Sequence, residues 1–157
     1  MTTNKRSKEE KDAVQVSFRI GDDNLEPDKI TMALGIKPSF SHKKGDIIPG
    51  MAKPYKRPSG LWGVDSPLPS NADVSSHLTA ILNIIEPKLP QLKKIQQQGY
   101  GMDIAVGCIY DSNRQSETFT LPANLVQRLG KLGVEIYFTI YCACQAQSEP
   151  PETGGRG

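Results

Sequence analysis

Few side chains in this chain are of the types that transfer protons or attack substrates. The 157 residues include only two histidines, His42 and His77, and histidine is the commonest acid–base residue at neutral pH. His77 lies one turn before Ile81 on the apolar side of an expected helix, so we expect a buried, hydrogen-bonded imidazole. An enzyme of unknown class built on His77 stays open as an alternative, and it requires a strongly shifted pKa in an open pocket.

Two short segments carry metal-binding residue types. Cys142 and Cys144 project from one face of an expected strand, whereas a structural zinc site needs four ligands and usually Cys-x-x-Cys spacing. Thiols packed in the core explain these cysteines better. A cluster of carboxylates also crowds one turn, where the positive end of a helix dipole accounts for it: Asp22, Asp23, Glu26 and Asp28. We expect neither a metal site nor a cofactor.

Motifs for nucleophilic catalysis and phosphate binding are missing from the sequence. It contains no Gly-rich phosphate loop and no Gly-x-Ser-x-Gly elbow. Ser39 and Ser41 lie beside His42 but match no known nucleophile motif. We therefore predict no catalytic residues.

The segment 36–60 contains the most basic part of the chain. Its prolines and glycines, without helical or strand periodicity, predict a long ordered or semi-ordered loop. Cations interleaved with an aromatic ring make up the predicted binding residues: Lys43, Lys44, Lys53, Tyr55, Lys56 and Arg57. Such side chains suit phosphate contact with base stacking, and they suit an acidic protein partner equally. A solvated loop without a partner is the third interpretation.

The apolar pattern around this loop switches repeatedly between strand and helix periods, which indicates a mixed fold. The expected elements are a strand at 14–20, a helix at 27–35, a strand at 61–64 anchored by Trp62, a helix that begins near 70–73 and ends or kinks at the prolines 87 and 90, an apolar helical face continuing to 99, a strand at 102–108, a polar turn at 111–114 with a short strand to 121, a helix at 122–133 and a strand at 134–142.

These elements predict a single α+β domain over residues 13–144. We expect a four- or five-stranded mixed sheet with about three helices mainly on one face. The polar segments 1–12 and 145–157 have little to bury and are expected to be disordered tails. Strand order does not follow from the sequence, and the oligomeric state stays open between monomer and homodimer because exposed sheet edges can pair.

Composition narrows the cellular context. A net charge of +2 is too small to indicate a nucleic-acid or membrane partner for the whole chain, and no segment approaches the length of a membrane span. The charged start lacks a signal-peptide core, and three cysteines are an odd number for a disulfide framework. We expect a cytoplasmic protein.

Several motifs occur in a fixed order along the chain. They are the alternating strand from Val14, the helix closing on Leu34-Gly35, the basic segment from Lys37 to Asp46, Gly60-Leu61-Trp62, the helix from His77 to Pro87, and the run from Leu132 to Tyr137. Together they resemble the bacterial domain-of-unknown-function 4279 family over about residues 14 to 142. The resemblance implies no activity, because none is established for that family.

The absence of a catalytic set favours a small non-catalytic module that binds another protein, because the core accounts for nearly every apolar residue. One specific version is an immunity-type protein that neutralises a partner toxin. A nucleic-acid-binding protein that uses the basic residues between 37 and 58 is the alternative, and an enzyme is the second alternative.

Overall fold

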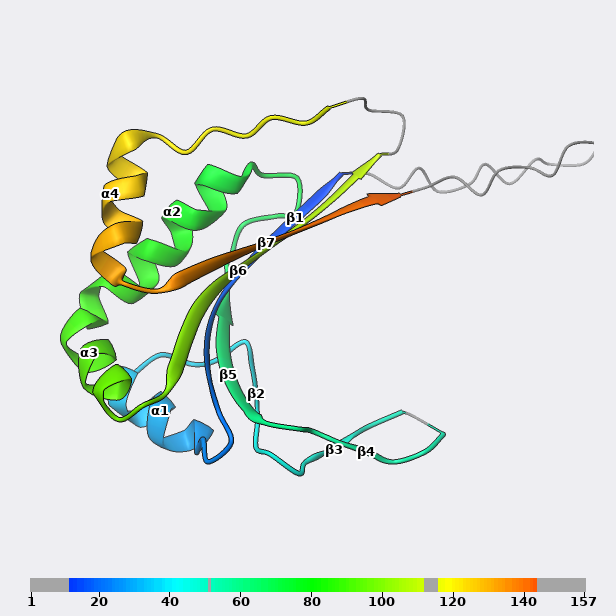
Figure 1. The fold of residues 1–157 in the computed structure, drawn as a ribbon, viewed down its shortest axis with the longest axis vertical. Helices are drawn as coiled ribbons and strands as arrows, with labels where there is room; N and C mark the ends of the chain where they lie inside the picture. The colour runs from blue at the N-terminus through cyan, green and yellow to red at the C-terminus, as the bar shows by residue number, and fades with distance from the viewer. Residues whose placement is uncertain (1–11, 51, 112–115, 144–157) are drawn as a thin grey trace, which may run out of the picture.

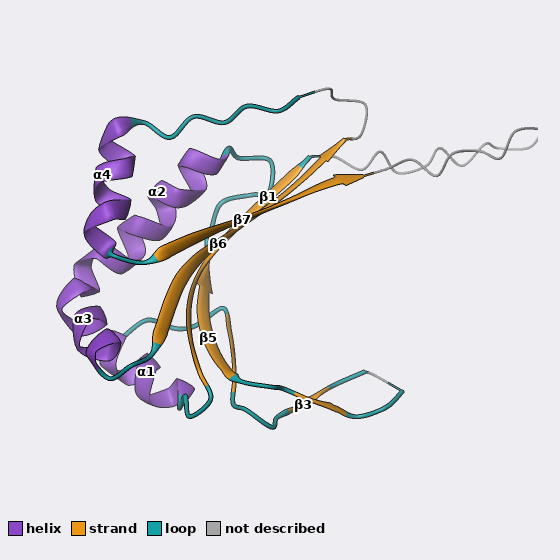
Figure 2. Cartoon of the chain, in the orientation of Figure 1, coloured by secondary structure: helices purple, strands orange, loops and turns teal. Residues whose placement is uncertain are grey.

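A mixed β-sheet with helices along one face forms the body of the molecule (Figure 1, Figure 2). The computed structural model describes residues 12–50, 52–111 and 116–143. The elements are β1 (Ala13–Asp22), α1 (Pro27–Leu34), β2 (Phe40–His42), β3 (Ile47–Ile48), β4 (Tyr55–Lys56), β5 (Gly60–Asp65), α2 (Val74–Ile85), the 3₁₀ helix η1 (Glu86–Lys88), α3 (Leu89–Gln97), β6 (Gly101–Asp111), α4 (Ala123–Leu132) and β7 (Glu135–Ala143).

The main sheet has the strand order β2-β5-β1-β6-β7. Adjacent strands are antiparallel except β6 and β7, which are parallel and are joined through α4. Two parallel strands need such a crossover because a tight turn reverses the chain and can join only antiparallel strands. The result confirms the predicted single α+β domain with a mixed sheet, and the number of strands in that sheet, predicted as four or five, is five.

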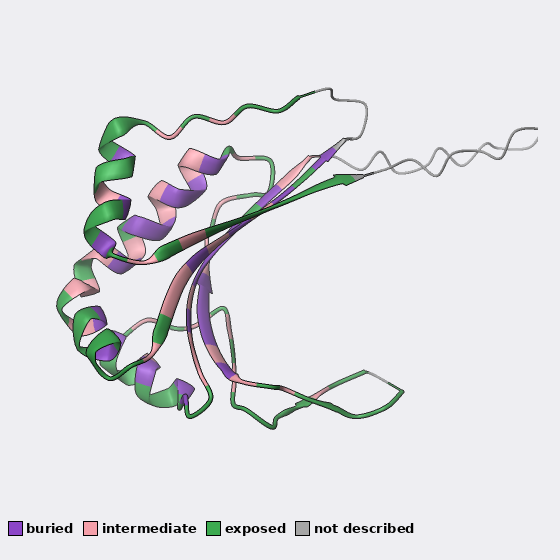
Figure 3. Ribbon diagram, in the orientation of Figure 1, coloured by how far each residue is buried: buried purple, intermediate pink, exposed green. Residues whose placement is uncertain are grey.

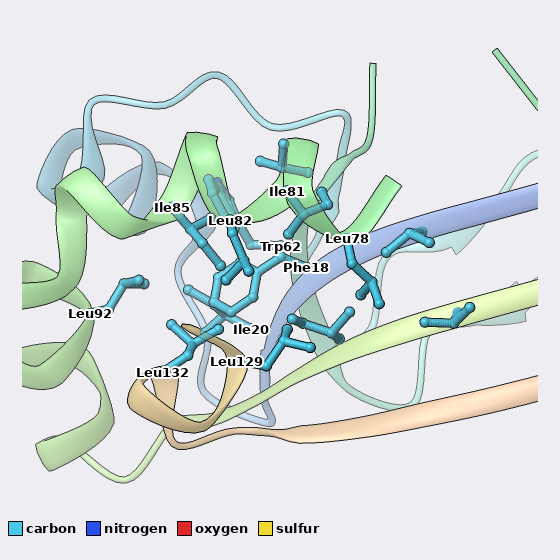
Figure 4. Packing of buried hydrophobic residues seen from close by; sticks show 14 of the residues in the cluster. Phe18, Ile20, Trp62, Leu78, Ile81, Leu82, Ile85, Leu92, Leu129 and Leu132 are labelled. Atoms are coloured by element: carbon cyan, nitrogen blue, oxygen red, sulfur yellow. The ribbon is translucent and has the colours of Figure 1, made fainter. Parts of the chain in front are cut away.

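One face of the sheet and the helices enclose the core. The alternating side chains of β1 that were predicted to face inward are buried, and the other side of the strand carries Gln15, Ser17 and Arg19. Figure 4 shows Phe18, Ile20 and Trp62 packed against leucines and isoleucines of α2 and α4. The Trp62 indole N–H also donates a 3.0 Å hydrogen bond to Thr31 Oγ1, which ties β5 to α1.

Local sequence signals set the ends of the helices as predicted. Pro27 begins α1 and Gly35 ends it with φ of 62°, a left-handed conformation that favours glycine. Asp73 caps α2 by accepting a 2.8 Å hydrogen bond from the Ser76 N–H. Pro87 and Pro90 interrupt the helical path, so that α2 passes into η1 and then α3.

Two predictions about local structure were wrong. The segment 36–60 is not one long loop, since it contains the edge strand β2 and the β3–β4 hairpin. Its many prolines and glycines hid strands of only two or three residues, which are too short to show periodicity. The described residues 116–121 form no strand. Residues 1–11 and 145–157 of the predicted tails and residues 112–114 of the predicted turn lie outside the described residues.

The prediction that the core absorbs nearly every apolar residue was also wrong. On β7 the side chains of Phe138 and Ile140, which alternate toward the helix side, keep 40% and 52% of their surface exposed. Cys142 is exposed as well, so it is not the packed core thiol that the pattern predicted. Figure 3 shows exposed residues along most of β7, because this strand is the edge of the sheet and the helices do not cover its end.

Candidate functional site

The β3–β4 hairpin projects from the β2 end of the sheet, away from the helices (Figure 1). Its backbone is held by hydrogen bonds from Gly45 N–H to Arg57 O and from Arg57 N–H to Asp46 O, both 2.8 Å. The Asp46 carboxylate accepts a further 2.8 Å bond from the Lys43 N–H. The hairpin base is therefore an ordered structure with defined side-chain directions.

The structure brings the predicted binding residues together on this hairpin and its base. Lys43, Lys44, Lys53, Tyr55 and Lys56 are exposed, and Arg57 is half-buried. Pairing of Ile47 with Lys56 and of Ile48 with Tyr55 gives each face of the ribbon one aliphatic residue beside a basic or aromatic one. The role of these residues in binding stays a prediction.

Acidic groups reduce the positive charge at the hairpin base. The Lys44 ammonium forms an ion pair with Asp23 from the acidic turn that precedes α1. Burial lowers the pKa of His42, and the nearby charge of Arg57 lowers it further, against a smaller opposing effect of Asp46. Burial and Arg57 thus disfavour the charged form of His42, and exposed lysines supply most of the positive charge.

The uncovered face of the sheet, opposite the helices, carries paired polar groups. Arg19 donates two hydrogen bonds to the Asp103 carboxylate, at 2.7 and 3.0 Å, and Ser17 Oγ donates one of 2.5 Å to Asp65. On β7 the Tyr137 hydroxyl donates to Glu135, which raises the pKa of the tyrosine.

Sequence reasoning identified the polar side of β1 but missed these partners. They come from β5 and β6, far along the chain, and only the strand order brings them to Ser17 and Arg19.

His77 is buried as predicted, with 1% of its surface exposed. Its Nδ1 atom is hydrogen-bonded to Ser66 Oγ at 2.8 Å. Burial lowers the pKa of His77, while the backbone carbonyl of Pro69 and the charge of Asp73 oppose that shift. No pattern in the sequence pointed to Ser66 as the partner, because Ser66 lies in the loop after β5.

A cavity of about 430 Å³ lies beside this pair, lined by Gln15, Asp65, Ser66 and His77 among others. The Nε2 atom of His77 is buried and has no hydrogen-bond partner within the described part of the chain. Although His77 lines the cavity, this nitrogen is enclosed, so in this arrangement it is not positioned to exchange a proton with a molecule in the cavity. The Ser66–His77 pair thus anchors the 66–70 segment to α2.

Metal-binding side chains are dispersed in the structure. Within residues 12–50, 52–111 and 116–143, no three histidines, cysteines or carboxylates are grouped so that they could hold a metal ion. Cys108 is buried and Cys142 is exposed, while Cys144 lies outside the described residues. None of the helices in these ranges is long and apolar enough to cross a membrane.

Comparison with known proteins places the chain in a family without revealing a close characterised relative. No curated protein and no solved structure matches it. Residues 12–143 match the family model described as a domain of unknown function (DUF4279), which covers the whole sheet and all the helices described above. The chain belongs to the DUF4279 family.

Proposed function

We propose that this protein is a non-catalytic module that binds another protein through the β3–β4 hairpin. The observation that carries the proposal is the exposure of Ile47 and Tyr55, at 61% and 54%, on a ribbon with an internally hydrogen-bonded base. Tyrosine and arginine are enriched at binding hot spots. Side chains presented on an ordered ribbon lose little conformational freedom when a partner docks.

The positive charge near Ile47 and Tyr55 indicates which kind of partner surface would bind. Lys56 lies beside Ile47 on one face of the ribbon, Tyr55 lies on the other face, and Lys43 and Lys53 are also exposed. An acidic protein surface that also offers apolar contacts would therefore complement the hairpin. A specific form of this proposal is a cytoplasmic immunity-type protein whose partner is a toxin. Small single-domain proteins of that kind act by covering a partner surface, and the support here is analogy.

Nucleic acid is the second candidate partner, because Tyr55 among lysines resembles a stacking platform beside phosphate contacts. The ion pair between Lys44 and Asp23 and the exposed Ile47 favour a protein, since a polyanion would meet the acidic turn. An enzyme built on His77 is the least supported candidate, because its imidazole is closed off from solvent.

The test begins with affinity purification from native cytosol, with and without nuclease, followed by affinity measurements with the recovered partner. Lys53→Glu/Lys56→Glu is compared with Lys93→Glu/Lys94→Glu, which reverses two exposed lysines on α3. Ile47→Ser is compared with Val126→Ser, which removes an aliphatic group that is also more than half exposed from α4. The hairpin variants should weaken binding by about tenfold or more, and the control variants by less than about twofold.

The outcomes separate the candidates. A nuclease-resistant partner whose affinity falls only with the hairpin variants supports the proposal. Nuclease-sensitive recovery with a steep dependence on salt would establish the nucleic-acid alternative. Equal effects of the hairpin and α3 lysine variants would remove the hairpin as the contact surface.

A further inference from the structure

Among the described residues, strand β7 presents an unpaired edge that lacks the usual protection against strand addition. It pairs with β6 alone among the described strands, and its register with β6 continues without a bulge from Glu135 to Ala143. Residues 136–142 contain no charge and no proline. Natural edges are normally blocked by lysine, proline, bulges or a covering loop, so a long apolar edge without them is a template for another strand.

Both faces of this edge carry exposed apolar or aromatic side chains. Tyr137 and Tyr141 lie on the uncovered face, exposed by 51% and 61%, and Tyr141 lies beside the exposed Ile109 of β6. Phe138 and Ile140 lie on the helix side, where Phe138 also stacks on Phe119 with the ring centroids 5.5 Å apart. A partner strand would therefore bury apolar surface on both faces while it satisfies the free backbone groups.

We propose that two copies of this chain pair through β7, antiparallel and centred on Thr139. In this register Thr139 faces itself across a two-fold axis, Tyr137 faces Tyr141 of the second copy, and Phe138 faces Ile140 of the second copy. These are aromatic–aromatic and aromatic–β-branched pairs, which are favourable across antiparallel strands. The strand is therefore complementary to itself.

The charge pattern fits a second copy as the occupant. Glu135, the single charged residue of β7, would lie opposite Ala143, so no like charges meet. The two-fold axis keeps the helices of both copies on the same side of a continuous ten-stranded sheet. Because β2 and β7 are opposite edges of the sheet, the two β3–β4 hairpins would stand at its far ends. The dimer does not depend on the proposed function of the hairpin.

The first test is a disulfide trap in a background that carries Cys142→Ser and Cys144→Ser. Directly opposed residues in an antiparallel pair have Cα atoms about 4.5–5.5 Å apart, within the range that a disulfide spans. Thr139→Cys should give a covalent dimer on mild oxidation. Tyr137→Cys is the control, because residue 137 of one copy and residue 137 of the other are offset by four residues along the strands, a distance of about 13 Å. A mixture of Tyr137→Cys and Tyr141→Cys should cross-link.

Sedimentation velocity supplies the second measurement. The unmodified chain should sediment as a dimer, and Ile140→Lys should weaken dimerisation by about tenfold or more because it places a charge opposite Phe138. A monomer at about 100 µM would overturn the proposal, as would a dimer unaffected by Ile140→Lys or one that Thr139→Cys does not trap. Pairing of β7 with a strand of a different protein, leaving the isolated chain monomeric, would overturn it too.

Discussion

At the scale of single residues, His77 is the group whose titration should couple to folding. Its pKa is lowered from 6.5 in the folded protein, chiefly by burial, so the folded state holds fewer protons than the unfolded state as the pH falls. The free energy of unfolding is therefore unaffected by His77 well above pH 6.5 and declines as the pH falls below that value. We expect chemical denaturation to give a lower free energy of unfolding at about pH 5.5 than at about pH 7.5. In His77→Asn this difference should shrink, and the variant should lose about 1–3 kcal/mol at pH 7.5 from the altered Ser66 contact and packing.

His42 provides the control for that measurement, because burial also lowers its pKa but the side chain is only half-buried. The His42→Asn variant should keep most of the decline in the free energy of unfolding between these two pH values, which lie about one unit on either side of the ordinary pKa of histidine. An unchanged decline in His77→Asn would show that other groups cause it.

At the scale of the elements, the edge strand β2 depends on a glycine in its neighbour. A Cβ at Gly63 would lie 2.2 Å from the Phe40 ring, so that ring sits directly over the glycine. Gly63→Ala should displace Phe40, loosen β2 and the hairpin base, and cost about 1–3 kcal/mol of stability. Hydrogen exchange of the amides in β2 measures the loosening.

Gly107→Ala is the matched control, because its Cβ would meet the nearest atom at 3.8 Å. Equal losses in the two variants would indicate a general effect of glycine replacement.

At the scale of the whole molecule, one continuous core should make unfolding cooperative. Trp62, the single tryptophan, is fully buried between the sheet and the helices, so its fluorescence reports tertiary packing (Figure 4). Fluorescence and far-UV circular dichroism should give coincident transitions. Leu82→Ala should shift both together, with a loss of about 2–5 kcal/mol, because Leu82 is fully buried. Separate transitions would mean that part of the sheet unfolds independently of this core.

Local patterns in the sequence determined the main elements and their inward faces. The alternation in β1, the cap at Asp73 and the proline–glycine boundaries of α1 each depend on residues a few positions apart. Such signals follow from backbone geometry and from the removal of apolar side chains from water. They also marked the basic residues and the burial of His77.

Tertiary structure alone decided which strands are neighbours and therefore which surfaces remain open. The pattern of β7 was typical of a well-buried strand, yet the sheet order leaves this strand at the edge with Phe138 and Ile140 exposed. The pairing of Arg19 with Asp103, 84 residues apart, also depends on that order. A sequence pattern records which side of a strand avoids water, whereas strand order depends on packing and loop closure across the whole chain.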